Sequence, residues 1–138
     1  KMDIIQLSVF IENKAGRITE VTDALAKAGL NIRGLAVSDT ADFGIVRVIV
    51  NDPIAGKTAL ERAGFTVRET PVLVINLADD RPGGLAAVLK TVSDAGVNVE
   101  YIYSLVSTYL ALNVADVDAA KALLKNTNID LVSSETLK

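Results

Sequence analysis

Alternating apolar and polar residues near the start of the chain predict a strand with one buried face. Within residues 4–11, every second position is apolar: Ile5, Leu7, Val9 and Ile11. Gln6 and Ser8 lie between them. Successive side chains of a strand point to opposite faces of its sheet, so this spacing places the apolar residues together on one face.

The next segments alternate between helical and strand periodicity. After a short Asn-Lys-Ala-Gly break, apolar residues recur at helical spacing from Ile18 to Ala28, and Gly29 stands where a left-handed residue commonly ends a helix. A later helix opens at Asp52-Pro53 and closes at Gly64, because proline suits the first turn of a helix. The other elements expected here are strands over 31–38, 43–50 and 65–69, with a turn over 39–42.

The second half of the chain repeats the first. Glu12–Ile32 aligns without gaps with Asp79–Val99 at an offset of 67 residues, and Val50–Leu60 matches Val114–Leu124 at an offset of 64. A repeat of this length, present twice, indicates two fused domains, 1–70 and 71–138. The elements expected in the second are a strand over 72–77, a loop over 79–84, a helix carrying Leu85, Val88 and Val92 that ends at Gly96, a hairpin of 97–106 and 109–114, a helix over 116–125 and a strand over 129–133.

The element order strand–helix–strand–strand–helix–strand predicts an α+β fold of two ferredoxin-like βαββαβ units in tandem. A unit of about 65 residues buries only about 60% of its unfolded surface. We therefore expect the units to lie side by side as a continuous antiparallel sheet with the helices on one face, which hides edge strands. Apolar residues expected on the other face suggest a contact surface and a homodimer: Phe10, Leu35, Val37, Ile102 and Val106.

Composition excludes several classes of function. The 138 residues carry a net charge of −3 and contain neither cysteine nor histidine. Without these residues the chain lacks thiolate metal sites and the commonest general base, so we expect no catalytic residues, metal or cofactor. The acidic balance argues against nucleic acid, and no apolar run approaches the roughly 20 residues of a membrane span. We expect a cytoplasmic protein translated from Met2, its only methionine.

The loop between the first strand and the first helix of each copy carries the candidate binding chemistry. A polar pair, Glu12-Asn13 or Asp79-Asp80, and then a basic residue precede a glycine at the helix start, Gly16 or Gly83. A helix N-terminus presents unpaired N–H groups and partial positive charge, which suits a carboxylate. In the alternative interpretation, Asn13 and Asp80 only cap their helices.

A second recurring element is the asparagine that follows each first helix. Gly-Leu-Asn-Ile ends at Ile32 and Gly-Val-Asn-Val ends at Val99, which places Asn31 and Asn98 before the second strands. An asparagine in this place also serves turns through its own side-chain hydrogen bonds. Its recurrence does not decide between a turn and a binding role, because duplication alone would preserve it.

These motifs resemble the ACT domain family. The pattern is strand–(D/E)-(N/D)-(K/R)-(P/A)-G–helix–G-(L/V)-N-(I/V)–strand, and the stretch ADDRPGGLAAVLKTVSDAGVNV is similar to the regulatory domain of phosphoglycerate dehydrogenases. The resemblance covers essentially the whole chain. It implies a free-standing tandem ACT protein that binds a free amino acid at the interface between ACT units and possesses no catalytic domain. It also implies a metabolic enzyme as the regulated partner.

The resemblance implies ligand residues from neighbouring units, with Asn13 paired to Asn98 and Asp80 paired to Asn31. Backbone N–H groups over 15–18 and 82–85 would receive the α-carboxylate. Ala15 stands where the family has proline and Asp80 where close relatives have asparagine, so the two sites differ. The complete candidate set is Asn13, Lys14, Ala15, Gly16, Arg17, Ile18, Asn31, Asp80, Arg81, Gly83, Gly84, Leu85 and Asn98.

Three functions compete on the sequence alone. The first is the amino-acid-binding regulatory protein, and the second is an accessory interaction subunit of a metabolic enzyme without a ligand of its own. The third is a small enzyme, for which Asp79-Asp80 is the sole suggestive cluster. The dehydrogenase family's histidine is replaced by Ile11 and Ala78, so the resemblance does not imply serine as the ligand.

Overall fold

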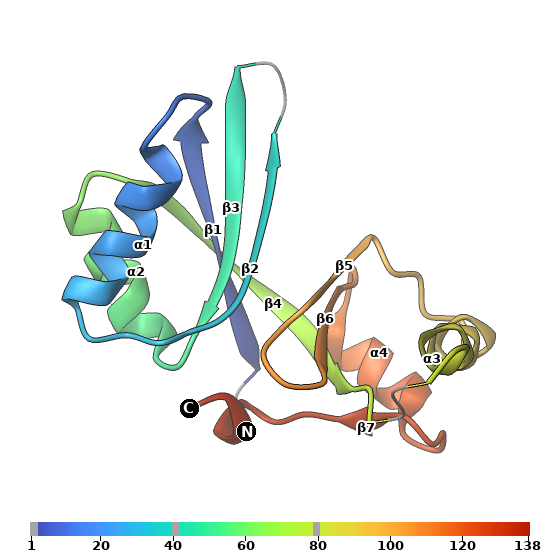
Figure 1. The fold of residues 1–138 in the computed structure, drawn as a ribbon. Coiled ribbons are helices and arrows are strands. Elements are labelled where there is room, and N and C mark those ends of the chain that lie inside the picture. Colours follow the sequence, from blue (N-terminus) through green and yellow to red (C-terminus); the bar gives the residue numbers. More distant parts are fainter. Residues whose placement is uncertain (1–2, 40–41, 79–80) are drawn as a thin grey trace. The chain divides into compact units, whose positions relative to one another are not determined.

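The computed structural model describes residues 3–39, 42–78 and 81–138 and confirms an α+β fold of two similar units (Figure 1). The N-terminal unit contains Ile5–Thr70 and the last two residues, Leu137–Lys138. The C-terminal unit contains Pro71–Thr136 and the start of the chain up to Ile4. The expected side-by-side arrangement of the units stays a prediction.

The N-terminal unit has the ferredoxin-like order of elements. Its strands follow the order β2-β3-β1-β4, and the β1–β3 and β2–β3 pairs are antiparallel. Figure 1 shows both helices of this unit on the same side of its sheet. The elements are β1 (Ile4–Glu12), α1 (Arg17–Lys27), β2 (Ile32–Asp39), β3 (Phe43–Val50), α2 (Pro53–Arg62) and the first part of β4 (Thr66–Asn76).

Aliphatic side chains from the sheet and both helices form the core of this unit. Val21 and Leu25 of α1 and Leu60 of α2 are fully buried against the sheet. Burying a side chain of this size stabilises a protein by about 1.5–3 kcal/mol. The strand residues of the same cluster are Leu7, Val9, Ile11, Val46, Val48 and Val50. The alternation predicted for the first strand thus marks the core face of the sheet.

The C-terminal unit repeats this arrangement. Its strand order is β7-β4-β6-β5. Counted along this unit, these are its fourth, first, third and second strands, which is the order of the N-terminal unit read in reverse. Leu73, Ile75, Val92, Leu112 and Leu124 are buried in its core. The elements are the end of β4, α3 (Gly84–Asp94), β5 (Tyr101–Ser104), β6 (Tyr109–Asn113), α4 (Val117–Leu124), β7 (Asp130–Leu131) and a 3-10 helix, η1 (Ser134–Leu137).

Several strand boundaries differ from the prediction. The two strands expected over 65–69 and 72–77 form one strand, β4. The last strand is only two residues long, and the η1 turn that follows was not predicted; it buries Leu137, which is 3% exposed. Strand β5 begins at Tyr101 rather than at residue 97. Strand length depends on where a partner strand offers hydrogen bonds, which local periodicity does not show.

A β-bulge in β2 corrects the predicted position of two exposed apolar residues. The register shifts between Ile32 and Gly34, which adds one residue and reverses the alternation that follows. Leu35 and Val37 are therefore opposite the core residues Val48 and Val46, on the helix side of the sheet. They remain exposed because β2 is an edge strand.

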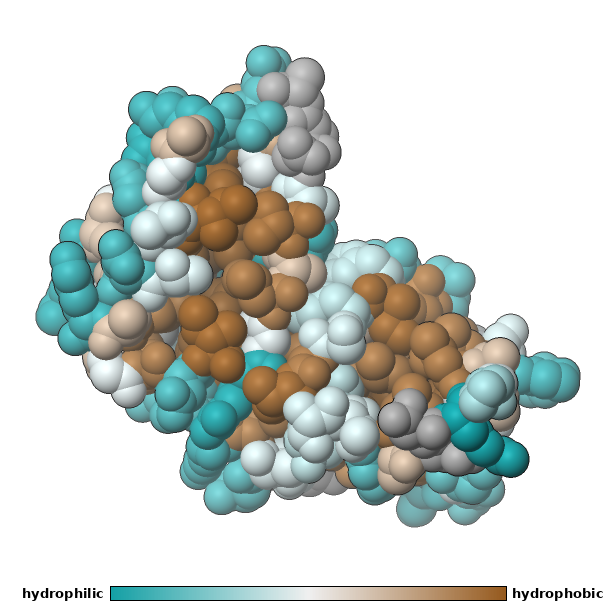
Figure 2. All heavy atoms as spheres, viewed as in Figure 1, coloured by the Kyte–Doolittle hydropathy of each residue, from teal (hydrophilic) through white to brown (hydrophobic). Residues whose placement is uncertain are grey.

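The prediction of an apolar outer face was also wrong for Ile102. This residue of the edge strand β5 is opposite Leu112, which belongs to the core of the C-terminal unit. Phe10 is opposite Ile45, out of phase with the core positions, and lies on the predicted face. Figure 2 shows that apolar side chains nevertheless reach the surface of both units. Exposed large apolar side chains therefore lie on edge strands, as Leu35, Val37 and Ile102 do, and also on helices, as Ile54 and Leu123 do.

The second helix of each unit provides a test of local stability. Asp52 accepts a hydrogen bond from the Ala55 amide at 3.2 Å, and Asp116 accepts one from the Ala119 amide at 3.0 Å. We expect Asp116→Ala to lower the free energy of unfolding by about 1 kcal/mol in urea denaturation, because it removes this cap. Asp116→Asn retains an acceptor and should lose much less; equal losses in both variants would contradict the capping role.

Candidate functional site

Both first helices begin at a glycine in the left-handed conformation. Gly16 precedes α1 with φ of 89°, and Gly83 precedes α3 with φ of 87°. A Cβ atom at either position would meet nothing within 4 Å, so lack of space is not the reason for glycine. Glycine is favoured there because the backbone has a positive φ. The alternative that Asn13 caps α1 is wrong, because Gly16 is the N-cap residue. Asp80, the other proposed cap, lies outside the described residues.

The start of α1 leaves two neighbouring amides without partners. The first hydrogen bond of the helix runs from the Glu20 amide to the Gly16 carbonyl at 3.0 Å. Over the described part of the chain, the amides of Ile18 and Thr19 have no hydrogen-bond partner. These are helix positions whose N–H groups have no intrahelical acceptor. They are available to an anion.

The start of α3 has the same geometry. The amide of Ala87 donates to the Gly83 carbonyl at 2.9 Å, and the amide of Gly84 donates to the Arg81 carbonyl at 3.0 Å. Counting only described residues, the amides of Leu85 and Ala86 have no partner. The repeat therefore preserves the exposed amides of the helix start, which is the structural basis of anion binding by helices.

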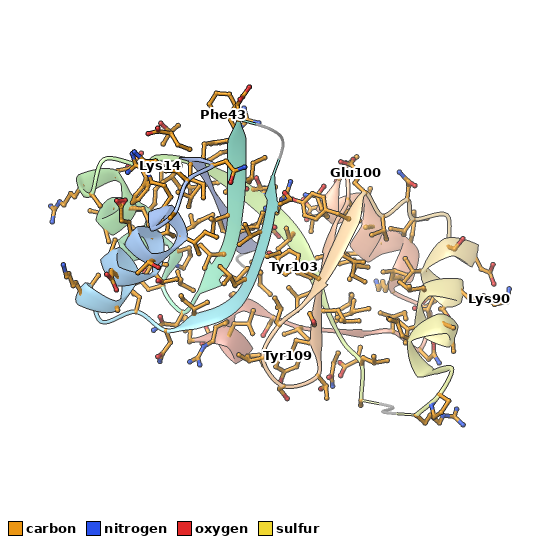
Figure 3. The ribbon with its side chains drawn as sticks, turned by 45° about the horizontal axis from the view of Figure 1, so that its top comes forward. Lys14, Phe43, Lys90, Glu100, Tyr103 and Tyr109 are labelled. Carbon is orange, nitrogen blue, oxygen red and sulfur yellow. The ribbon has the colours of Figure 1, made fainter. Side chains whose placement is uncertain are left out.

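Arg17, the first residue of α1, is held by two carboxylates of its own unit. Its Nη2 atom is 2.7 Å from Glu12 Oε1, and its Nη1 atom is 2.9 Å from Glu20 Oε2. Hydrogen bonds to these two carboxylates raise the pKa of the Arg17 guanidinium. Lys14, labelled in Figure 3 in the loop before α1, is 3.9 Å from Glu12. The positive charge of Arg17 is thus already neutralised within this unit.

The two recurring asparagines have exposed side chains. Asn31 engages Asn51 through its backbone: its amide donates to Asn51 Oδ1 at 2.9 Å, and its carbonyl accepts from the Asn51 amide at 3.2 Å. The side chains of Asn31 and Asn98 make no hydrogen bond within residues 3–39, 42–78 and 81–138. The two carboxamides therefore do not stabilise a turn through hydrogen bonds of their own. Both are available to a ligand.

One unit alone does not bring the whole predicted set together. Asn13, Lys14, Ala15 and Gly16 form the loop before α1, whereas Asn31 follows the opposite end of that helix. With 11 residues, α1 is about 16 Å long. The proposed pairs of Asn13 with Asn98 and of Asp80 with Asn31 join different units and stay predictions.

A hollow beside each first helix adds residues that the sequence analysis missed. In the C-terminal unit, a hollow of about 310 Å³ borders Arg81 and Gly84 and is also lined by Asn76, Asn128 and Asp130. In the N-terminal unit, a hollow of about 350 Å³ borders Arg17. The second repeat offset, of 64 residues, aligns Phe65, which lines the N-terminal hollow, with Ile129, which lines the C-terminal hollow. This alignment was the signal in the sequence that could have indicated these residues.

The described residues form neither a metal cluster nor a membrane-spanning helix. No cluster of three or more histidine, cysteine, aspartate or glutamate residues there is arranged to hold a metal ion. No helix in that part of the chain is long and apolar enough to span a membrane.

A family model described as an ACT domain pair matches residues 2–138. The chain belongs to this family. The crystal structure of protein BT0572 from Bacteroides thetaiotaomicron is similar, with 40% identity, a TM-score of 0.89 and coverage of 99% of this chain and 96% of that one. The ACT resemblance of the loop and asparagine motifs is thereby confirmed.

More distant relatives share the fold or part of the sequence. The ligand-free regulatory subunit of aspartate kinase from Thermus thermophilus has a TM-score of 0.67 at 19% identity, over 91% of this chain and 90% of that one, which shows the fold alone. D-3-phosphoglycerate dehydrogenase of Methanocaldococcus jannaschii is 30% identical over 100 residues. That match covers 71% of this ACT domain pair but only 18% of the dehydrogenase.

The left-handed glycine before α3 can be tested directly. We expect Gly83→Ala to lower the free energy of unfolding by about 1–2 kcal/mol, because alanine is strained at positive φ. Gly83→Asn should cost less, since asparagine tolerates this conformation better. Chemical denaturation of the two variants beside the unchanged protein measures both effects; a fully stable Gly83→Ala would show that the left-handed start is not needed.

Proposed function

We propose that this ACT domain pair is a non-catalytic regulatory protein that binds a free amino acid. The observation that carries the proposal is the pair of neighbouring, unpartnered amides at the start of α1 and α3. Such amides and the partial positive charge of the helix start suit an α-carboxylate. Membership in a family of ACT domain pairs supports a regulatory role.

The α-ammonium group needs acceptors, and the exposed carboxamides supply them. Asn31 and Asn98 have side chains without hydrogen-bond partners in the described chain, and each has a carbonyl oxygen that accepts from an ammonium group. In this proposal the asparagine of a neighbouring ACT unit completes each site. The chain acts in the cytoplasm as a homodimer, and ligand binding shifts the population of the form that a metabolic enzyme recognises.

A second candidate function is an accessory subunit that acts through protein contact alone. It is favoured by exposed apolar side chains of the N-terminal sheet: Leu35 and Val37 of the edge strand β2 are 40% and 45% exposed, and Phe43 at the start of β3 is 64% exposed. Exposed apolar patches commonly mark protein interfaces. This candidate predicts a folded protein that responds to no amino acid.

Calorimetric titration with the twenty common amino acids tests the proposal. We expect at least one to bind, and we expect Asn98→Ala to weaken its binding about tenfold or more, because a hydrogen bond to a charged group is lost. The matched control is Asn126→Ala, since Asn126 is also exposed but follows α4. Silence toward all twenty amino acids in a folded sample would reject ligand binding and favour the accessory subunit.

A further inference from the structure

A hollow of about 420 Å³, here named the Lys121 hollow, lies in the C-terminal unit and borders neither α1 nor α3. Lys121 of α4 lines it together with Val72 and Val74 of β4. The two valines alternate with the core residues Leu73 and Ile75, so they face away from the core. The Lys121 hollow is therefore separate from the hollow beside α3 and from the helix starts.

Aliphatic side chains form one wall of the Lys121 hollow. Val72 and Val74 are 2% exposed, and Ile4, which belongs to the C-terminal unit, is 7% exposed. Leu131 and Val132 complete the wall and are half-buried. A wall of this kind stabilises a bound aliphatic chain by about 25 cal/mol for each Å² of apolar surface removed from water. The volume of the hollow lies within the range of about 300–1,000 Å³ that is usual for small-molecule pockets.

The lysine of this hollow has a counterpart in the N-terminal unit that binds a carboxylate. At the repeat offset of 64, Lys121 aligns with Lys57. Lys57 Nζ is 3.1 Å from Glu69 Oε1, and the hydrogen bond to Glu69 raises the pKa of Lys57. The N-terminal unit thus shows what a lysine at this position of the second helix reaches, which is a carboxylate carried by the last strand of the unit.

The C-terminal unit retains the lysine but has no carboxylate at the aligned position. Ser133 aligns with Glu69 and lines the Lys121 hollow, as does Ser134. Among the described residues, the hydroxyl groups of these two serines have no hydrogen-bond partner. The shorter serine leaves open the place that the Glu69 carboxylate takes in the other unit, and its hydroxyl adds a donor there.

Lys121 retains donors for an incoming carboxylate. Its Nζ atom is 3.1 Å from Asp3 Oδ1, in an ion pair whose side chains are 26% and 33% exposed. An ammonium group has three N–H donors, and this ion pair uses one of them. The remaining donors and the two serine hydroxyls together suit the oxygens of a carboxylate, since hydrogen bonds to a charged acceptor are stronger than neutral ones.

Two carboxylates of the chain limit the charge of a ligand in the Lys121 hollow. Asp3 is bound to Lys121, and Glu135 also lines the hollow and is exposed. A ligand with a second carboxylate would meet like charges here, which disfavours binding. The hollow therefore suits one carboxylate attached to an aliphatic chain.

We propose that the Lys121 hollow binds a small monocarboxylate with an aliphatic chain. The carboxylate of the ligand lies at Lys121, Ser133 and Ser134, in the place that Glu69 takes in the N-terminal unit. The aliphatic chain packs on the wall that contains Val72. This site goes beyond the proposed function, because it shares no residue with the helix starts or with the two recurring asparagines.

NMR titration of the full, ¹⁵N-labelled chain with isovalerate (3-methylbutanoate) tests this site. We expect the amide signals of Ser133 and Ser134 to shift and to saturate at one molecule per chain. Lys121→Met should weaken binding about tenfold or more, because a hydrogen bond to a charged group is lost. The matched control is Lys57→Met at the aligned lysine, which should change the affinity by less than about twofold, because that lysine does not line the hollow.

Two analogues of isovalerate test the chemistry of the ligand. Isopentylamine has the same branched end but an ammonium group instead of the carboxylate, and it should not shift the two serine signals. Methylsuccinate carries a second carboxylate in place of one methyl group, and the like charges of Asp3 and Glu135 should prevent its binding. Equal binding of isovalerate and isopentylamine would overturn the proposal.

A further variant gives the Lys121 hollow the residue of the N-terminal unit. Ser133→Glu places a carboxylate of the chain opposite Lys121 and should abolish isovalerate binding with the circular dichroism unchanged. Ser93→Glu adds a carboxylate at an exposed position of α3 and should retain binding. Isovalerate that fails to bind the unchanged protein, or that still binds Ser133→Glu, overturns the site. Either result leaves the proposed amino-acid binding standing, since Asn98→Ala should not alter isovalerate binding.

Discussion

The left-handed backbone at one glycine determines what the start of each first helix offers to a ligand. If α1 began at Asn13, the carboxamide of that residue would bind the first amides of the helix, as N-cap side chains do. The helix begins instead after Gly16, and α3 after Gly83, and neither residue has a side chain to perform this role. The amides therefore remain for an acceptor from outside the helix. The conformation of this one residue thus determines where the helix begins and which of its amides have no partner within the helix.

Much of the fold was predictable because local signals agree with it. Asp52-Pro53 opens α2 as expected, and the left-handed Gly29 follows the end of α1. The bulge near Arg33 was not predictable from periodicity, because an added residue shows only in the pairing of β2 with β3. The Arg33 side chain donates hydrogen bonds to the carbonyls of Leu137 and Lys138 at 3.0 Å, a contact with a distant part of the chain. The added residue places the later side chains of β2 on the opposite face of the sheet from the one predicted.

The candidate site shows the same division between local and distant information. The glycine at each helix start was visible in the sequence, because its motif recurs at a fixed offset. The C-terminal hollow was not, because its opposing wall joins Asn76 to Asp130, 54 residues apart. Only the pairing of the short strand β7 with the end of β4 places these side chains together. Periodicity finds the strands, but it does not show which side chains meet at their ends.

A helix start by itself attracts any small anion, so it does not select an amino acid. Selection requires a second charge of opposite sign at a fixed place, together with a surface for the side chain. In the C-terminal unit, Asp130 lines a hollow beside α3 and accepts a hydrogen bond from Asn76 Nδ2. In the N-terminal unit, Arg17 and Glu20 neutralise each other in the equivalent place. A shift in population between two states also requires that the ligand bind one state more tightly than the other.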